Sequence, residues 1–112
     1  MIPYKTLGVI GGDLRQAHIA NCLAKQGKKV KAFLLEKNAI LNPELICKEP
    51  LETGLKDCEA VILPMPLSGD GTWVNSPFSQ ERASVSQCLR AMQSGTAVFA
   101  GEQIQNKYRL MS

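Results

Sequence analysis

The chain has 112 residues, of which 45% are hydrophobic and 21% charged, the size and composition of one globular domain. Thirteen Lys and Arg against ten Asp and Glu leave a net charge of +3, and the basic residues are scattered, so no nucleic-acid-binding surface is expected. No apolar run approaches the ~20 residues of a membrane helix, and the first six residues do not open a signal peptide, so we expect a cytoplasmic protein without membrane contact.

The chain begins with an apolar run over residues 5–10, which stops at Gly11 and Gly12. This is typical of a buried strand that enters a tight turn. Residues 30–35 form a second apolar run of the same kind. A helix between two such strands predicts a parallel pair within an α/β layer structure.

The intervening helix has recognisable ends. The carboxylate of Asp13 is expected to cap it, and Gln16 is expected to reach back to the Asp13 backbone in a capping box. Gly27 is well placed for the left-handed residue that ends the helix. The predicted apolar stripe consists of Leu14, Ala17, Ala20, Leu23 and Ala24.

The middle of the chain is less regular. We expect a connection over 38–43, a short strand over 44–48, and one weak helical turn over 50–57 that is broken by Gly54. Residues 59–63 include four consecutive apolar residues, which predicts a third parallel strand covered on both faces.

A loop without periodicity follows over 64–79, PMPLSGDGTWVNSPFS, and loops this long are usually functional or mobile. Ser79 is expected to cap the next helix, with Glu81 in its first turn and Gly95 after its end. Residues 96–100 form the last predicted strand. The core stripe of the helix is predicted to be Val85, Cys88, Leu89 and Met92.

Together these elements predict a three-layer α/β fold, a mostly parallel open sheet of four to five strands with flanking helices, of the Rossmann-like or flavodoxin-like kind. Residues 1–101 are expected to form the domain. Residues 102–112 are expected to be a polar C-terminal tail.

The cysteines and the single histidine restrict the chemistry. Cys22, Cys47, Cys58 and Cys88 never form a C-x-x-C pair, so we expect four reduced thiols that pack as small apolar groups and no metal site. His18 is the only histidine, which excludes a catalytic triad built from this chain. A hydrogen-bonded role is favoured for it over that of a base.

Ligands of open parallel sheets bind beyond the carboxyl ends of the strands, where residues 11–16, 64–78 and 101–103 are predicted to converge. A dinucleotide fingerprint would need glycines at positions 11, 13 and 16, but Asp13 and Gln16 occupy two of them. Glu36 does fall where a ribose-binding acid would. Nucleotide binding by this turn is therefore disfavoured.

Arg15 and the long loop are the remaining candidates. Arg15, in the first turn of the helix, would make a bidentate carboxylate site, and the alternative is a solvated surface arginine. Trp73 and Phe78 place aromatic rings among neutral hydrogen-bonding side chains of the loop. A lid over a small molecule or a docking surface would explain that mixture, and the alternative is a surface excursion stiffened by proline.

Three stretches of the chain are informative about its family, and they are VIGGDLRQ (9–16), AVILPMPLSGDGTWVNSPFSQE (60–81) and AVFAG (97–101). In these stretches, which fall in the same order, the chain resembles the amino-terminal domain of the A subunit of dipicolinate synthase. The resemblance implies part of a sporulation oxidoreductase that, with a B subunit, oxidises a dihydrodipicolinate precursor to dipicolinate with a nicotinamide cofactor, NADP. In that family a Rossmann domain follows this one in the chain. It also implies that this chain alone binds no cofactor and is inactive alone.

The resemblance carries over Gly11, Gly12, Asp13, Arg15 and Gln16 of the turn, and Pro64, Gly71, Val74, Phe78 and Ser79 of the loop. The match does not fix their roles. We infer that Arg15 binds a carboxylate of a small dicarboxylic substrate, that Gln16 and the Gly12 region supply hydrogen bonds, and that the loop closes over the cleft between domains. The substrate-binding residues expected are Gly11, Gly12, Asp13, Arg15, Gln16, Ser68, Gly71 and Phe78. No catalytic residue is assigned.

Two other functions stay open. In the first, the loop with Trp73 and Phe78 and the tail from Glu102 form a non-catalytic interface with another domain or subunit, and a homo-oligomer is compatible with this. In the second, the chain is a stand-alone nucleotide-binding domain, which Asp13 and Gln16 disfavour.

Overall fold

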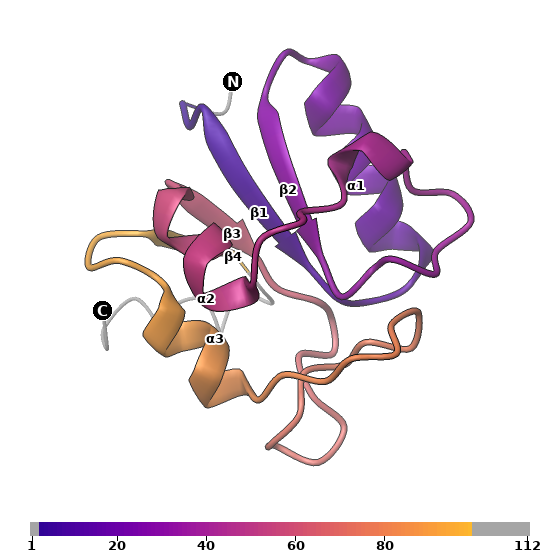
Figure 1. Cartoon of the computed structure of the whole chain (residues 1–112), viewed down its shortest axis with the longest axis vertical. Coiled ribbons are helices and arrows are strands. Elements are labelled where there is room, and N and C mark those ends of the chain that lie inside the picture. Colours follow the sequence, from indigo (N-terminus) through magenta and orange to yellow (C-terminus); the bar gives the residue numbers. More distant parts are fainter. Residues whose placement is uncertain (1–2, 100–112) are drawn as a thin grey trace.

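The computed structural model describes residues 3–99, and these form a four-stranded, all-parallel sheet of order β2-β1-β3-β4 with helices on both faces (Figure 1). The predicted α/β fold is therefore confirmed, with four strands. The strands are β1 (Thr6–Ile10), β2 (Lys29–Phe33), β3 (Ala60–Ile62) and β4 (Ala97–Phe99). The helices are α1 (Leu14–Lys25), α2 (Leu51–Gly54) and α3 (Val85–Ala91), with 3-10 turns at Pro43–Leu45 and Leu55–Asp57.

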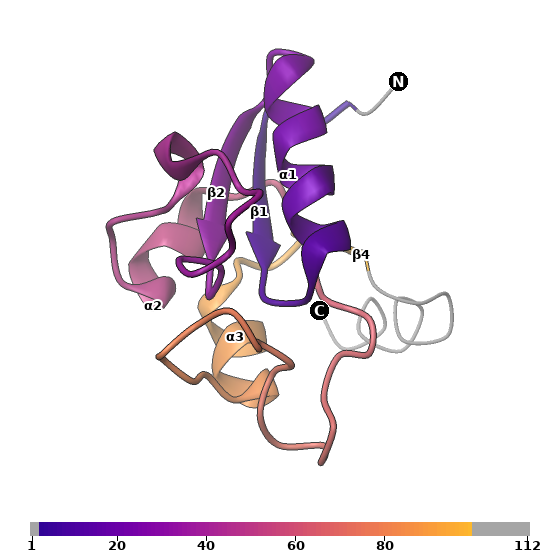
Figure 2. The same cartoon turned by 90° about the vertical axis from the view of Figure 1, so that its right-hand side faces the viewer.

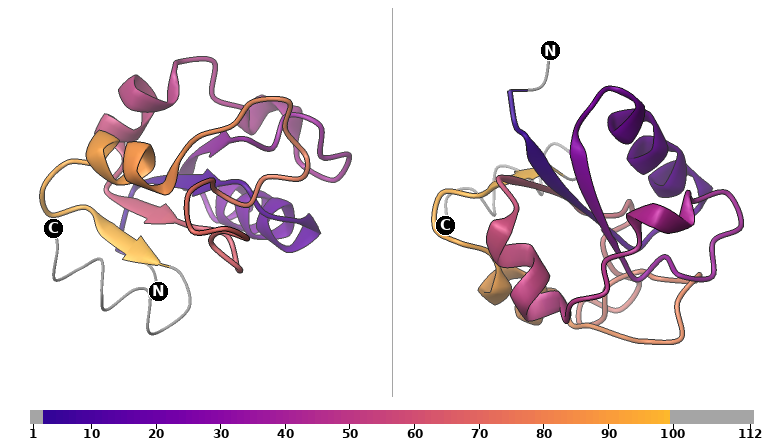
Figure 3. Two further views of the ribbon diagram at one scale, coloured as in Figure 1. Left: turned by 90° about the horizontal axis from the view of Figure 1, so that it is seen from below. Right: turned by 45° about the horizontal axis from the view of Figure 1, so that its top comes forward.

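The sheet is the middle of three layers. Figure 2 shows α1 on one face and α2 and α3 on the other, and the left view of Figure 3 shows the same order from below. β1 lies in the interior of the sheet and pairs with β2 on one side and β3 on the other. From β1 the chain passes first to β2 on one side and later to β3 on the other, so the strand order reverses at β1. Folds of this kind bind ligands at such a point, beside the carboxyl ends of β1 and β3.

Each face of the sheet carries its own apolar core, since the strands are buried on both sides. One cluster packs under α1, and the other packs under α2, α3 and the loop that follows β3. The first includes Leu7, Val9, Ala17, Ala20, Leu23, Ala32 and Ala60, and the second Ile10, Phe33, Leu55, Val61, Leu67, Val74, Cys88 and Val98.

α1 matches its predicted ends but not all of its predicted stripe. Asp13 is the N-cap residue, and Gly27 adopts the left-handed conformation with φ of 88° just after the helix. Ala17, Ala20 and Leu23 are buried and Ala24 packs against them. Leu14, the first residue of the helix, is by contrast 48% exposed.

The irregular middle differs from the prediction in two places. Pro43 lacks an N–H group and starts a 3-10 turn capped by Asn42, so the expected strand over 44–48 is reduced to one isolated bridge between Ile46 and Ala32. The expected break at Gly54 is met only in part, since α2 ends at Gly54 but the helical φ of −66° lets the chain continue directly into the 3-10 turn Leu55–Asp57. A side chain on Gly54 would lie 2.8 Å from the ring of Phe33, so close packing explains this glycine.

α3 begins later than predicted, because Ser84 and not Ser79 is its N-cap. Ser84 and Gln87 form a complete capping box. Cys88 is buried, and Val85 and Met92 pack against the core, whereas Leu89 is only half-buried. Gly95 has a φ of 91° in the turn before β4, and the predicted last strand is present over its described part. Residues 100–112, including the tail predicted from 102, lie outside the described residues.

The four cysteines are free thiols, as expected. Burial raises the pKa of Cys58 to about 11 and that of Cys88 to about 12, so both remain protonated and act as core residues. Across residues 3–99, none of the helices combines the length and the apolar character needed to cross a membrane.

Candidate functional site

The candidate site lies where the chain turns from β1 into α1, beside the end of β3. Gly11 and Gly12 form this turn with φ values of 58° and 85°, a conformation that favours glycine. Asp13 and Arg15 follow at the start of α1, and Pro64 and Met65 come from the end of β3. The fold thus brings together residues that are some fifty positions apart in the sequence.

The glycine turn is covered by the loop that follows β3. The backbone N–H of Gly12 donates to the carbonyl oxygen of Asn75 at 2.8 Å, and a side chain on Gly11 would lie 2.5 Å from that same oxygen. Asn75 is itself fixed, because its N–H donates to the Leu67 carbonyl and its amide side chain to the Pro66 carbonyl. The backbone N–H of Gly12, which a bound phosphate would need as a donor, is therefore already engaged within the chain.

Arg15 is held by Asp13 and by the end of β3. The Asp13 carboxylate accepts from the Arg15 backbone N–H at 2.9 Å, as an N-cap does, and from the guanidinium Nη2 at 3.0 Å. Nη2 also donates to the Met65 carbonyl oxygen at 3.2 Å. These hydrogen bonds to Arg15 lower the pKa of the Asp13 carboxyl and raise that of the guanidinium, so both groups are charged near neutral pH.

Gln16 does not form the predicted capping box. Its side chain is buried and donates from Nε2 to the carbonyl oxygens of Ile10, at 3.0 Å, and Ile62, at 3.3 Å. These carbonyls lie at the ends of β1 and β3, so the amide connects the two strands at the site instead of reaching back to Asp13. Gln16 therefore supports the site by holding the two strand ends together, and its Nε2 donor is engaged there and not with a ligand.

A cavity of about 240 Å³ lies beside Arg15, lined by Asp13, Arg15, Gln16, Ile19, Ile62, Leu63, Met65 and Phe99. Arg15 is the one cation among these lining residues, Asp13 and Gln16 are the other polar ones, and the remaining aliphatic and aromatic side chains make the rest of the wall apolar. The volume is below the roughly 300 Å³ at which ligand pockets usually begin. Its chemistry suits a small carboxylate with an apolar body, held partly by this surface and partly by another.

The predicted loop residues Ser68, Gly71 and Phe78 do not line this cavity. The Ser68 hydroxyl donates to Asp70 at 3.1 Å and accepts from the Gly71 N–H at 2.9 Å, which shapes an exposed turn. Gly71 has a φ of 84°. Phe78 is half-buried, and its carbonyl oxygen accepts from the Lys37 N–H at 2.8 Å. These three residues shape the loop and anchor its end.

Glu36, at the position of a ribose-binding acid, serves the loop as well. Its carboxylate accepts from the Ser79 hydroxyl at 2.9 Å and from the Gln80 N–H at 2.8 Å. Burial opposes ionisation, but these hydrogen bonds and nearby Lys37 prevail and lower the pKa of Glu36. Ser79 and Glu36 thus connect the end of the loop to the segment that follows β2.

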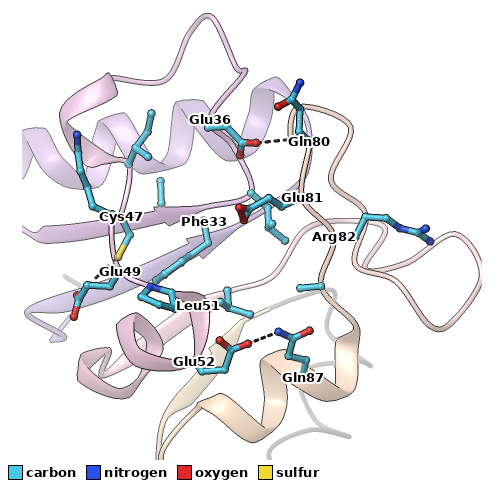
Figure 4. Close-up of a pocket in the computed structure, with 16 residues that line it drawn as sticks. Phe33, Glu36, Cys47, Glu49, Leu51, Glu52, Gln80, Glu81, Arg82 and Gln87 are labelled. Atoms are coloured by element: carbon cyan, nitrogen blue, oxygen red, sulfur yellow. Dashed lines mark hydrogen bonds between the residues drawn. The ribbon is translucent and has the colours of Figure 1, made fainter.

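A larger hollow of about 660 Å³ lies on the other face of the sheet, between the end of β2 and helices α2 and α3 (Figure 4). Its rim is acidic, with glutamates in excess over Lys48 and Arg82. Glu52 binds Gln87 and Glu36 binds Gln80 across it, as the dashed lines show (Figure 4). An anionic ligand is disfavoured there, so the smaller cavity beside Arg15 is the better candidate site.

Sequence reasoning missed the apolar residues that line the cavity, and it also missed Met65 and Asn75 as hydrogen-bonding partners. Both act through backbone carbonyl oxygens, which leave no side-chain signal in a sequence. His18 is exposed, with its Nε2 3.5 Å from the Cys22 thiol. Among residues 3–99, no group of three or more His, Cys, Asp or Glu side chains could hold a metal ion.

Comparisons with known proteins agree with this architecture. A model of the family of N-terminal domains of the dipicolinate synthase A subunit matches residues 6–109. The dipicolinate synthase A chain of Bacillus subtilis has a similar fold, with a TM-score of 0.71 and 19% identity over 98% of this chain and 38% of that chain. The A subunit of dipicolinate synthase from Bacillus halodurans has a TM-score of 0.69 and 21% identity over 94% of this chain and 38% of that chain. A search of the curated proteins finds no match.

Proposed function

Because the chain belongs to the family of N-terminal domains of the dipicolinate synthase A subunit, we propose that it is the substrate-side domain of a sporulation oxidoreductase that oxidises a dihydrodipicolinate precursor to dipicolinate. The family match, which spans residues 6–109, is the observation that carries this proposal. The chain spans only 38% of the length of two solved relatives. The complete reaction is therefore assigned to this domain together with further parts of such an enzyme.

In this proposal Arg15 binds one carboxylate of the dicarboxylic substrate. The guanidinium can hold a carboxylate with two parallel hydrogen bonds, and Ile19, Met65 and Phe99 offer an apolar wall to a six-membered ring. Gly12 and Gln16 shape the site, because their donors are engaged with Asn75 and with the strand ends. The small volume of the cavity supports a half-site that a second domain completes.

The nicotinamide cofactor is assigned elsewhere. The residues of the glycine turn do not fit a dinucleotide, since the Gly12 N–H is bound to Asn75 and the Asp13 carboxylate would repel a pyrophosphate. We therefore place NADP on a downstream Rossmann domain of the same polypeptide. The proposed partners are that domain and the B subunit of dipicolinate synthase, and a homo-oligomer is compatible with the fold. A cytoplasmic location follows from the same proposal.

Titration calorimetry of this chain tests the proposal. We expect weak binding of dipicolinate and no binding of NADP. Arg15→Gln should abolish dipicolinate binding, whereas Arg90→Gln, which removes an equal charge from an exposed position of α3, should leave it unchanged. Tight NADP binding by this chain, or dipicolinate binding that is indifferent to Arg15, would contradict the proposal.

The second candidate function is that of an interaction module. Trp73 remains 38% exposed, and the guanidinium of Arg82 stacks over its ring at 4.0 Å from the centroid. An aromatic ring paired with arginine is common at protein interfaces. In this version Trp73→Ala weakens assembly with the B subunit or with the downstream domain, as measured by ultracentrifugation. Assembly that Trp73→Ala leaves unchanged would contradict this second function.

A further inference from the structure

The guanidinium of Arg15 already carries a carboxylate from its own chain. Its Nε lies 3.2 Å and 3.3 Å from the two carboxylate oxygens of Asp13, and its Nη2 lies 3.0 Å from Oδ2. This is the two-point arrangement in which arginine binds the carboxylates of ligands. A ligand that approaches the same edge of the guanidinium finds that edge occupied.

We propose that Asp13 is an internal competitor, whose place on the Nε and Nη2 edge of Arg15 a ligand carboxylate takes. The exchange rests on the proposed function only for the identity of that ligand. It assigns to Asp13 a role opposite to substrate binding, because its charge lowers the affinity of the site for every carboxylate. Binding strong enough to persist then requires contacts from the surface that completes the cavity.

Two features of the pair make the exchange accessible. The side chains of Arg15 and Asp13 are 69% and 46% exposed, so water and salt screen their attraction. Asp13 also has a second partner, because its Oδ1 accepts the Arg15 backbone N–H at 2.9 Å. When the guanidinium leaves, the carboxylate is still the cap of α1 and keeps the stabilisation that the helix dipole gives an anion.

The guanidinium is likewise held in place without Asp13. Nη2 donates to the Met65 carbonyl oxygen at 3.2 Å, so Arg15 keeps a fixed contact at the cavity rim when its carboxylate partner changes. Among the described residues that line the cavity, Arg15 is the single cation and Asp13 the single anion. The two charges offset each other, so the affinity of the cavity for an anionic ligand depends on whether Asp13 stays paired with Arg15.

The test is Asp13→Asn, with Asp70→Asn as its matched control. Asparagine is as good an N-cap as aspartate, so the cap to the Arg15 N–H is retained while the competing charge is lost. Asp70 is also an exposed carboxylate that accepts backbone N–H groups, from Thr72 at 2.9 Å and Trp73 at 3.0 Å, so its variant changes net charge equally in a remote turn. The Nε–H resonance of Arg15 reports binding in NMR titrations with dipicolinate and with malonate.

We expect Asp13→Asn to lower the dissociation constants of both probes by about three- to tenfold, and Asp70→Asn to leave them unchanged. Weaker binding by Asp13→Asn, or no binding of either probe to it, would overturn the proposal, because Asp13 would then position Arg15 for its ligand. Equal binding would overturn it as well, because the charge of Asp13 would then have no effect on affinity. Tighter binding of malonate alone would support the exchange and contradict dipicolinate as the substrate. Arg15-dependent dipicolinate binding that Asp13→Asn leaves unchanged would support the substrate and contradict the exchange.

Discussion

The backbone N–H of Gly12 and the carbonyl oxygen of Asn75, sixty-three positions apart in the sequence, lie 2.8 Å from each other at the end of β1. In open α/β sheets that N–H is among the donors that hold the phosphates of a nucleotide. Here it holds the loop that follows β3. The glycine turn therefore docks a segment of its own chain against the site, and the same contact explains why the turn contains glycine.

Gly11→Ala is expected to destabilise the fold by about 2–4 kcal/mol. The new methyl group would lie 2.5 Å from the Asn75 carbonyl oxygen, at a φ of 58° that alanine adopts only with strain. Gly71→Ala is the matched control, because Gly71 has a φ of 84° but no atom within 4 Å of the added carbon. Its cost is the backbone strain alone, about 1–2 kcal/mol.

Urea unfolding of the two glycine variants separates the cost of the steric conflict from the cost of the backbone strain. The difference between them measures the steric conflict with the loop. Equal losses of unfolding free energy would mean that the loop moves away from Gly11 without resistance. In that case the contact between the glycine turn and Asn75 would have no part in holding the loop.

Gln16→Leu should lower the free energy of unfolding by about 1–3 kcal/mol, because two carbonyl oxygens at the strand ends lose a buried donor. Gln26→Leu changes the same side chain at an exposed position at the end of α1 and should stay within about 0.5 kcal/mol of the wild type. Thermal unfolding followed by circular dichroism measures both. A comparable loss of unfolding free energy in the two variants would contradict the role of Gln16 in connecting the two strands.

Gln16 also shows how far the sequence alone could be followed. The apolar runs that end at Ile10 and Leu63 predicted β1 and β3 correctly, because strands covered on both faces are continuously apolar. A glutamine at the start of a helix, however, is predicted to be exposed or to cap. Its burial depends on two carbonyl groups that meet it only when the strands pair, which no local pattern encodes.

Lys31 is a second case of the same kind. Its side chain is buried, although a lysine is usually exposed, because its Nζ donates to Glu49, Asp57 and the Gly54 carbonyl oxygen. The position of Arg15 beyond the carboxyl end of β1 was predicted, since it follows the glycine turn. Its partner Met65 was not, because that contact uses only a backbone carbonyl.

Ser84→Ala should cost about 1 kcal/mol of stability, since the Ser84 hydroxyl accepts the Gln87 N–H at 2.9 Å and closes the capping box of α3. Ser86→Ala alters an exposed serine of the same helix and should have little effect. Denaturant unfolding of both variants checks this. An equal effect at the two positions would show that the cap contributes nothing beyond helix propensity.

The contact between Glu36 and the end of the loop should make stability depend on pH in acid. Burial opposes ionisation of Glu36, but the hydrogen bonds from Gln80 and Ser79 outweigh it, so the folded pKa lies below its usual value of 4.5. The stabilisation is therefore complete above about pH 4.5 and is lost as the pH falls through the folded pKa. Since the side chain is exposed, it amounts to about 0.5–1 kcal/mol at neutral pH.

A double-mutant cycle of Glu36→Gln and Ser79→Ala, measured by urea unfolding at pH 7 and at pH 3, tests this dependence. At pH 7 the two changes should be coupled, because the Ser79 hydroxyl donates to the ionised carboxylate at 2.9 Å. As the pH falls through the folded pKa the carboxylate of the wild-type chain takes up a proton, so the coupling should be smaller in acid. A coupling that is the same at both pH values would contradict the charge-assisted contact and leave a neutral hydrogen bond between Glu36, after β2, and the loop.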